Sequence, residues 1–368
     1  MINLTIFGNI VLRDKVLANG VVIVDEGIIR FVGDRNKAKP HGRVIEASEM
    51  LVTPGFIDIH CHAGRNIWVY EDPGTVADYH LSHGTTSMLC TLYRNLPHEK
   101  LLASIALIKD TMQRYTNILG VHLEGPYLNP ELGSVKSRET RIRKDEYIEL
   151  AQTGIIRQWT FSPEIEGSDI FLKDIQKFGI IPAIGHSSAS LEQVNRAVTN
   201  GVGIVTHLFN ATGTCISPSR YAGTSEVSFD SACMLNNDLY YEIICDKQGI
   251  HVRPDMIKLL IKTVGIEKII GITDCCAGDL SDSDVNFFNN EIMGSNLTMD
   301  RVAMNLQKLG LSFSDIFKIT AFNPACALAM ENKIGSIRIG NYANLLITDE
   351  NLNIYKIILH NSMEVISC

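Results

Sequence analysis

The sequence of 368 residues lacks the signals that mark several protein classes. No uninterrupted apolar run approaches the roughly 18 residues of a membrane-spanning helix. The first residues also lack the basic start and apolar stretch of a secretory signal. Basic residues are not in excess, because 33 Lys and Arg stand against 41 Asp and Glu. These absences argue against membrane and nucleic-acid partners and predict a cytoplasmic protein, in which local positive groups hold any anionic substrate.

The nine cysteines contain no Cys-x-x-Cys pair, and their number is odd. We therefore expect no disulfide scaffold. The cysteines should be reduced thiols that pack as small apolar side chains. The 45% of hydrophobic residues can form a large core. The length suits one (β/α)₈ barrel of about 250 residues together with a small accessory domain.

Both ends of the chain have the character of short strands. Residues 1–52 are rich in β-branched side chains and are interrupted by turns such as 25–27 and 33–34. Residues 335–368 carry similar strand-like runs separated by glycines. We expect one small β-sandwich domain built from both termini, with antiparallel strands in its amino-terminal part. Its boundaries with the central domain, 53–334, lie near residues 52 and 334.

Eight apolar, β-branched runs follow one another through this central segment, and each precedes a helical or loop stretch. They are residues 55–60, 85–93, 118–124, 156–163, 180–186, 203–208, 240–245 and 269–274. Between them, Leu101, Ile105, Ile108 and Met112 share one helical face, and a second helix is predicted to begin near Pro254. Alternating strands and helices predict a parallel sheet, and eight strands predict a (β/α)₈ TIM barrel in the α/β class.

Histidines and carboxylates stand at the ends of these predicted strands. They are His60, His62, Glu124, His186, His207 and Asp274. In a (β/α)₈ barrel the carboxyl ends of the strands meet at one face, where such enzymes keep their active sites. The sequence therefore predicts that these side chains converge on one pocket.

This set of side chains predicts a divalent metal site. Glu124, His186 and His207 offer one oxygen and two nitrogens, which a catalytic zinc uses while keeping a position for water. His60 and His62 leave the same face of a strand and can grip one ion. Zn²⁺ is the expected metal in one or two copies, although Fe²⁺ and other divalent ions accept the same donors. Asp274 is the candidate acid/base, which takes a proton from water and passes it to a leaving amine.

In its motifs the chain resembles the amidohydrolase superfamily, and within it the N-acetylglucosamine-6-phosphate deacetylase family, over essentially its full length. The matching stretches are residues 54–62, 122–127, 185–187, 206–211, 249–252, 273–274 and 294–299. The resemblance implies metal binding by Glu124, His186 and His207 and acid/base chemistry by Asp274. Family members with the His-x-His pair can hold a second metal, and this sequence keeps that pair.

The resemblance also implies a substrate side. In the family, the positions of Asn210, the Ala211 backbone and His251 hold the sugar phosphate, together with an arginine from the neighbouring subunit of a homodimer. The sequence departs from the family here, with Val135 in place of a usual histidine and an altered segment at 217–223. Arg220 in that segment is the candidate for the arginine that crosses the dimer.

The expected function is hydrolysis of an amide, with removal of the acetyl group from N-acetylglucosamine 6-phosphate or a closely related amino sugar phosphate as the leading hypothesis. One alternative is an amidohydrolase that acts on another N-acyl or cyclic amide substrate. Relatives that open cyclic amides commonly carry a carboxylated lysine on strand four, and residues 156–163 contain no lysine. The other alternative is a binding protein that has lost catalysis, which the retention of the metal-ligand and acid/base candidates disfavours.

Overall fold

The computed structural model describes residues 2–93, 95–134, 141–212, 224, 226–278, 283–288, 290–362 and 366–367. The chain folds into two compact units. One contains Ile59–Ala77 and Met88–Leu297, and the other contains Met1–Asp58, Asp78–Ser87 and Thr298–Cys368.

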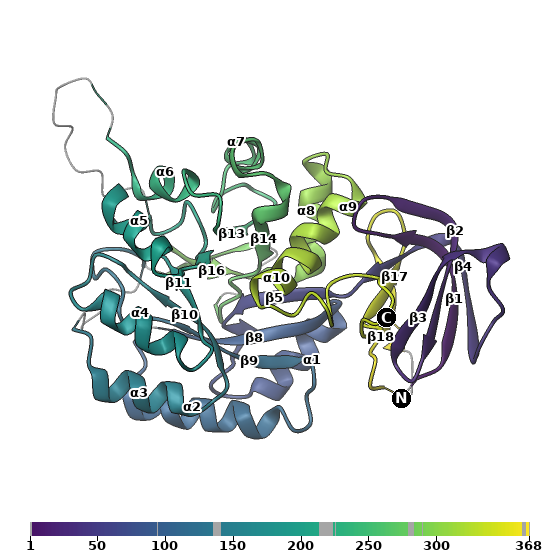
Figure 1. The fold of residues 1–368 in the computed structure, drawn as a ribbon, viewed down its shortest axis with the longest axis horizontal. Coiled ribbons are helices and arrows are strands. Elements are labelled where there is room, and N and C mark those ends of the chain that lie inside the picture. The colour runs from purple at the N-terminus through teal and green to yellow at the C-terminus, as the bar shows by residue number, and fades with distance from the viewer. Residues whose placement is uncertain are drawn as a thin grey trace. The chain divides into compact units, whose positions relative to one another are not determined.

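All eight predicted barrel strands are present and form one parallel sheet, in the order β14-β13-β12-β11-β10-β9-β8-β5 (Figure 1). They are β5 (Phe56–Cys61), β8 (Thr85–Tyr93), β9 (Ile118–Glu124), β10 (Ile156–Phe161), β11 (Ile181–Ile184), β12 (Ile204–Val205), β13 (Tyr240–Ile244) and β14 (Ile269–Ile272). The first and last strands approach each other just past β14, where the Asp274 amide donates to the His60 carbonyl at 2.9 Å. Beside this contact, the backbones of Cys61 and Cys275 pair in an isolated parallel β-bridge. The predicted barrel is confirmed.

Helices alternate with these strands. They are α1 (Pro73–Ser82), α2 (His98–Thr111), α3 (Lys144–Gln152), α4 (Ser168–Gln176), α5 (Leu191–Thr199), α6 (Phe229–Met234), α7 (Pro254–Val264), α8 (Met299–Lys308), α9 (Phe313–Phe317) and α10 (Asn323–Ala327), with a π-helical turn at Lys318–Phe322. Helix α2 buries Leu101, Ile105 and Ile108, as its periodicity predicts. Helix α7 has Pro254 in its first turn, where a missing backbone N–H costs nothing.

An aromatic cluster packs α3 and α4 onto β10. The ring of Phe171 lies 5.1 to 5.4 Å from those of Tyr127, Tyr147, Trp159 and Phe161, each in an edge-to-face arrangement. Aromatic pairs prefer this geometry because the positive edge of one ring meets the negative face of another. The cluster fixes the helical layer against the strand that neighbours β9 and β11.

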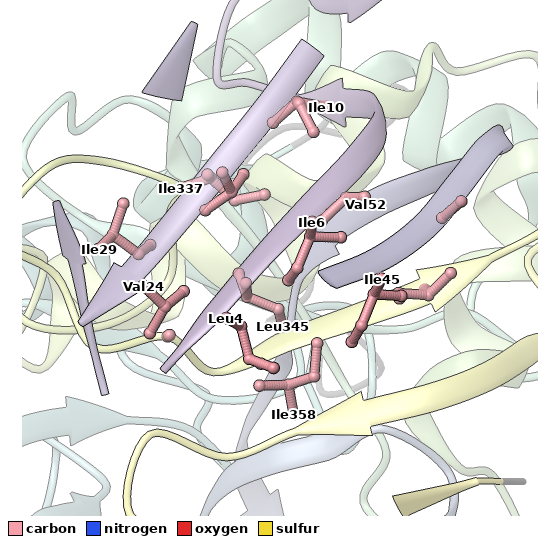
Figure 2. Close-up of a cluster of buried hydrophobic side chains, with 14 of the residues drawn as sticks. Leu4, Ile6, Ile10, Val24, Ile29, Ile45, Val52, Ile337, Leu345 and Ile358 are labelled. Atoms are coloured by element: carbon pink, nitrogen blue, oxygen red, sulfur yellow. The ribbon is translucent and has the colours of Figure 1, made fainter. Parts of the chain in front are cut away.

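Strands from both ends of the chain form the second sheet, in the order β19-β18-β17-β4-β1-β2-β3 (Figure 1). They are β1 (Leu4–Val11), β2 (Val16–Asp25), β3 (Ile28–Asp34), β4 (Arg43–Pro54), β17 (Leu345–Thr348), β18 (Ile354–Ile358) and β19 (Ile366–Ser367). Their buried aliphatic side chains form the core in Figure 2, in which Leu4 and Ile6 of β1 lie close to Leu345 and Ile358. The predicted β domain built from both termini is therefore present.

One pairing in this sheet differs from the antiparallel arrangement expected for the amino-terminal strands. Strand β4 pairs with β1 in parallel, with Leu4 opposite Arg43 and Gly8 opposite Ala47. The hairpins already occupy one edge of β1 with β2, so the chain returns past a short 3₁₀ turn at Arg35–Lys37 to the other edge. A crossover of this kind brings the next strand back in the same direction.

Two short hairpins and a 3₁₀ turn at Ile266–Lys268 complete the secondary structure of the described residues. The hairpins pair β6 (Ala63–Gly64) with β7 (Ile67–Trp68), and β15 (Val285–Phe288) with β16 (Glu291–Ser295). Among the cysteines that the structure describes, all seven are free thiols and six are buried, as expected. Within the described ranges, no helix combines the length and the apolar character needed to cross a membrane.

Candidate metal centre

The barrel brings the predicted metal ligands and the predicted acid/base together at the carboxyl ends of its strands. His60 and His62 lie at the end of β5, Glu124 ends β9, and the other three each follow a strand by two residues. All are nearly excluded from solvent, with exposed fractions from 0% for His60 to 9% for Asp274. Charged groups that are buried this close together need hydrogen-bond partners or opposite charges nearby.

The backbone is left-handed at three of these residues. The φ angles are +46° at His186, +27° at His207 and +48° at Asp274. Residues other than glycine rarely adopt this region, and each instance costs on the order of 1–3 kcal/mol. In each case the strand ends two residues earlier, and the turn leaves the side chain lining the same pocket. Such strain persists where the surrounding structure fixes it, and it is concentrated at functional sites.

The first group of donors surrounds one oxygen of Glu124. Its Oε1 atom lies 2.8 Å from Nε2 of His186 and 2.9 Å from Nε2 of His207, and these two nitrogens are 3.1 Å apart. The Nδ1 atom of His207 faces the Asn210 carbonyl at 3.2 Å. A carbonyl only accepts, so Nδ1 carries a hydrogen, and in the neutral ring Nε2 presents its lone pair to Glu124. Lone pairs at this separation repel one another unless positive charge lies between them.

The second group adjoins the first. The Nε2 atoms of His60 and His62 are 3.2 Å apart, and both lie near Oδ1 of Asp274, at 3.4 and 3.3 Å. His62 Nε2 also lies 3.3 Å from Oε2 of Glu124. Four histidines therefore surround the Glu124 carboxylate, because His60 Nε2 also lies 3.8 Å from Oε1. Two sets of three side chains, His60-Glu124-His207 and His60-His62-Asp274, place their donor atoms within 4.8 Å of one another.

The electrostatics of the cluster favour a cation. Burial by itself raises the pKa of the Glu124 and Asp274 carboxyls, but the adjacent histidines outweigh it and lower the pKa of both. Burial works against the charged form of His62 and His207, yet the carboxylates raise the pKa of His62 to about 10 and that of His207 to about 9. Protons thus supply positive charge here, and a divalent ion bound by the same atoms would replace them. The donor set of imidazole nitrogens and carboxylate oxygens fits such an ion.

Glu242 belongs to the centre, although the sequence analysis missed it. Its Oε2 atom lies 3.1 Å from Nδ1 of His60, and its side chain is fully buried on β13. The available signal was a charged residue within the otherwise apolar and aromatic strand Tyr240–Ile244. Glu242 was not predicted because it stands in the middle of its strand, whereas the candidate residues were those at strand ends.

A cavity of about 530 Å³ opens onto the donor cluster. It is lined by His62, Glu124, His186, His207 and Asp274, and also by the predicted substrate residues Asn210, Ala211 and His251. The predicted Arg220, like Val135 and the segment 217–223, lies outside the described residues. The volume suits a small-molecule ligand.

His251 and Asn210 are held in place by their neighbours. The Nδ1 atom of His251 lies 3.1 Å from the Asp246 carboxylate, and its Nε2 atom lies 3.1 Å from the Gly294 carbonyl. These two hydrogen-bond acceptors, one on each side of the ring, fix its orientation. The Asn210 amide donates to the His251 carbonyl at 3.3 Å. The two predicted substrate residues therefore lie together on one side of the cavity.

Aromatic side chains form a further part of the lining that the sequence analysis did not single out. Trp68 and Tyr93 have ring centroids 5.5 Å apart, and Trp68 stands edge-on to the ring of His62 at 6.4 Å. Trp68 follows β5 and Tyr93 ends β8, so this aromatic wall lies beside the His-x-His pair. A ligand bound at the metal centre meets an apolar surface on this side.

Proteins of known sequence and structure resemble this chain over most of its length. An N-acetylglucosamine-6-phosphate deacetylase of Bacillus subtilis (strain 168) is 27% identical over 393 residues, which covers 97% of this chain and 96% of that protein. An N-acetylgalactosamine-6-phosphate deacetylase of Escherichia coli O157:H7 is 26% identical and covers 85% and 88%. The crystal structure of N-acetylglucosamine-6-phosphate deacetylase from Pasteurella multocida matches with a TM-score of 0.87 at 24% identity over 100% of both chains, which shows a common fold.

The family resemblance drawn from the motifs is confirmed by a match over most of the sequence. The sequence model of the amidohydrolase family aligns with residues 51–363, a range that contains every residue of the donor cluster. Members of this family are metal-dependent hydrolases. The chain therefore belongs to the amidohydrolase family.

Proposed function

We propose that this protein removes the acetyl group from an N-acetyl amino sugar phosphate, with N-acetylglucosamine 6-phosphate as the first substrate to test. The observation that carries the proposal is the position of Glu124, whose carboxylate is contacted by four histidines at the mouth of the barrel. Relatives that align over nearly the whole chain bear the names of amino sugar phosphate deacetylases, which supports this substrate class.

Glu124, His186 and His207 would hold one divalent ion, and His60 and His62 would hold a second. Zn²⁺ is the proposed metal, because three protein ligands of this kind suit a catalytic zinc site. A divalent ion bound here polarises a carbonyl oxygen and makes water nucleophilic near neutral pH. No nucleophilic side chain is then required.

Asp274 moves the proton. Its lowered pKa keeps the carboxylate ionised near neutral pH, so that it accepts a proton from the attacking water. The carbon–nitrogen bond breaks when Asp274 passes this proton to the departing amine. One water and one amide thus yield acetate and the free amino sugar phosphate, and Asp274 returns to its starting state.

A separate group of residues is proposed to bind the phosphate of the substrate. His251, the Asn210 side chain and the Ala211 backbone line one side of the cavity, and in this proposal they hold the phosphate. We propose that Arg220 of a second subunit completes this anion site, which makes the active form a homodimer. The substrate is a cytoplasmic metabolite in this proposal.

The test is release of acetate from a matched set of compounds by the zinc-loaded protein. We expect hydrolysis of N-acetylglucosamine 6-phosphate or its galactosamine isomer, and much weaker hydrolysis of the same sugars without phosphate. Hydrolysis of a dihydropyrimidine or hydantoin but of no acetyl sugar would favour the alternative of a cyclic-amide hydrolase. Strand β10 (Ile156–Phe161) argues against that alternative, because it contains no lysine for a carboxylated bridge. Tight binding of the sugar phosphate without turnover, in protein shown to contain metal, would favour the binding-protein alternative.

A further inference from the structure

We propose that Glu242 is a positioning residue that fixes the tautomer and orientation of His60, so that the Nε2 atom of this histidine is reserved for a metal ion. This inference rests on the proposed function, because it takes His60 to be a ligand of the second ion. Neither the motifs in the sequence nor the catalytic scheme above requires Glu242.

The Glu242 carboxylate is buried within β13, and its exposed fraction is 0%. A carboxylate in such a position is costly unless hydrogen bonds satisfy it. Gln158 on β10 donates from Nε2 to Oε1 at 2.8 Å, and the backbone N–H of His207 points to Oε2 at 3.4 Å. His60 Nδ1 lies 3.1 Å from that same Oε2 atom. The carboxylate therefore receives donors from three other strands or strand ends.

These contacts determine which nitrogen of His60 carries the hydrogen. An ionised carboxylate only accepts, so Nδ1 of His60 must be the donor in this pair. In the neutral ring the Nε2 atom then bears the lone pair. That atom lies 3.2 Å from Nε2 of His62 and 3.4 Å from Oδ1 of Asp274. A carboxylate behind a metal-binding histidine raises the basicity of the ring and fixes its orientation.

A polar network holds the carboxylate itself. The Nε2 atom of Gln158 also lies 3.4 Å from Nε2 of His122, which is 2.8 Å from the Thr160 hydroxyl. The Thr160 hydroxyl in turn lies 2.8 Å from that of Thr206. These buried side chains come from three strands of the barrel, β9 and β10 and the end of β12, and they restrict the rotation of Gln158. Glu242 is thus a fixed group against which His60 is aligned.

A competing account assigns Glu242 only a balancing charge for a buried imidazolium. The two accounts predict opposite orders for two substitutions. E242Q keeps an oxygen at the same distance from His60 but removes the charge, whereas E242D keeps the charge and withdraws it by one methylene. If Glu242 positions His60, the distance between its oxygen and Nδ1 of His60 matters most, and E242D should be the more harmful change. If Glu242 only balances charge, its negative charge matters most, and E242Q should be the more harmful change.

The experiment is a titration of chelator-treated protein with Zn²⁺, followed by elemental analysis of the dialysed complexes and by thermal melts that verify folding. The wild-type protein should bind two equivalents. E242D should bind the second equivalent about 10- to 100-fold more weakly, with the first unchanged. E242Q should lose less than about tenfold, because an acceptor oxygen stays in place opposite Nδ1 of His60. Ile243→Val, a mild packing change at the next residue of β13, is the control and should match the wild type.

Three results would overturn the inference. In the first, E242Q is more damaging than E242D, which assigns Glu242 to charge balance. In the second, E242D binds both ions as the wild type does, or both sites weaken together. In the third, the wild-type protein binds a single equivalent and still hydrolyses its substrate, so the proposed function stands while the role of Glu242 fails. Binding of two ions without any hydrolysis would instead refute the proposed function and leave the positioning of His60 intact.

Discussion

Replacement of Asp274 by Asn tests the proposed proton transfer most directly. Asparagine keeps the size and shape of the side chain, but it neither accepts the proton of the attacking water nor donates one to the leaving amine. Asp274 Oδ1 lies only 3.3 and 3.4 Å from the Nε2 atoms of His62 and His60, and the side chain is 13% exposed. The other carboxylate of the cluster, Glu124, is committed to four imidazole contacts and is not a substitute.

The magnitude follows from the loss of general acid/base catalysis, which contributes about 10²- to 10⁴-fold. At about 1.36 kcal/mol per factor of ten, this corresponds to about 2.7 to 5.4 kcal/mol in the activation free energy. We expect the upper part of this range, because one group serves both proton transfers. The decrease should appear in kcat, while KM changes little because Asp274 does not bind the phosphate.

The assay is acetate release at saturating N-acetylglucosamine 6-phosphate, with metal content measured on the same samples. Asp174→Asn is the matched control, since it makes the same chemical change in α4 and away from the cavity. A turnover within about tenfold of the wild type, in protein that retains its metal, would refute the role of Asp274. Loss of metal from the variant would show instead that Asp274 is a ligand.

Three further predictions concern the metal, the core and the pH dependence of stability. Treatment with a chelator should abolish hydrolysis, and re-added Zn²⁺ should restore it; hydrolysis that survives complete metal removal would contradict the proposal. Phe171→Ala should lower the free energy of unfolding by about 3–5 kcal/mol in denaturant titrations, because a buried aromatic ring leaves a cavity. Asp174 has a lowered pKa because Lys177, Lys144 and Tyr147 hydrogen-bond to its carboxylate. Its contribution to stability is therefore full above the ordinary carboxyl pKa of about 3.9 and is lost as pH falls further. The melting temperatures of wild type and Asp174→Asn should differ by a constant amount from pH 7 to about pH 4 and begin to converge as the pH falls below about 4; a difference that stays the same below pH 4 would contradict this assignment.

The barrel and the donor cluster were predictable because local pattern and topology coincide there. Each strand is a short apolar run, and the carboxyl ends of parallel strands must meet, so residues such as Glu124 and His207 are expected to converge. The distances within the cluster were not predictable, since they depend on the left-handed turns after β11, β12 and β14. Nothing in the sequence at His186 or Asp274 requires a positive φ angle.

Glu242 and Trp68 show why part of the site escaped prediction. Glu242 acts on His60 across the barrel interior, and a contact between residues 182 positions apart leaves no local signature. Trp68 belongs to the two-residue strand β7 (Ile67–Trp68), whose direction is set by tertiary packing. The domain boundaries near residues 52 and 334 and the homodimer stay predictions.

The sheet that joins the two ends of the chain bears on how the protein is made. Strand β4 is released early in synthesis, but its partner β17 emerges only after nearly 300 further residues. Until then one edge of β4 offers unpaired peptide groups, which are a template for pairing with other chains. The free energy of closing so long a loop grows slowly, by about 0.6 kcal/mol for each doubling of its length, so the delay is one of timing more than of stability. A messenger truncated before codon 345 would therefore yield a product prone to aggregate, although it encodes every residue of the metal cluster.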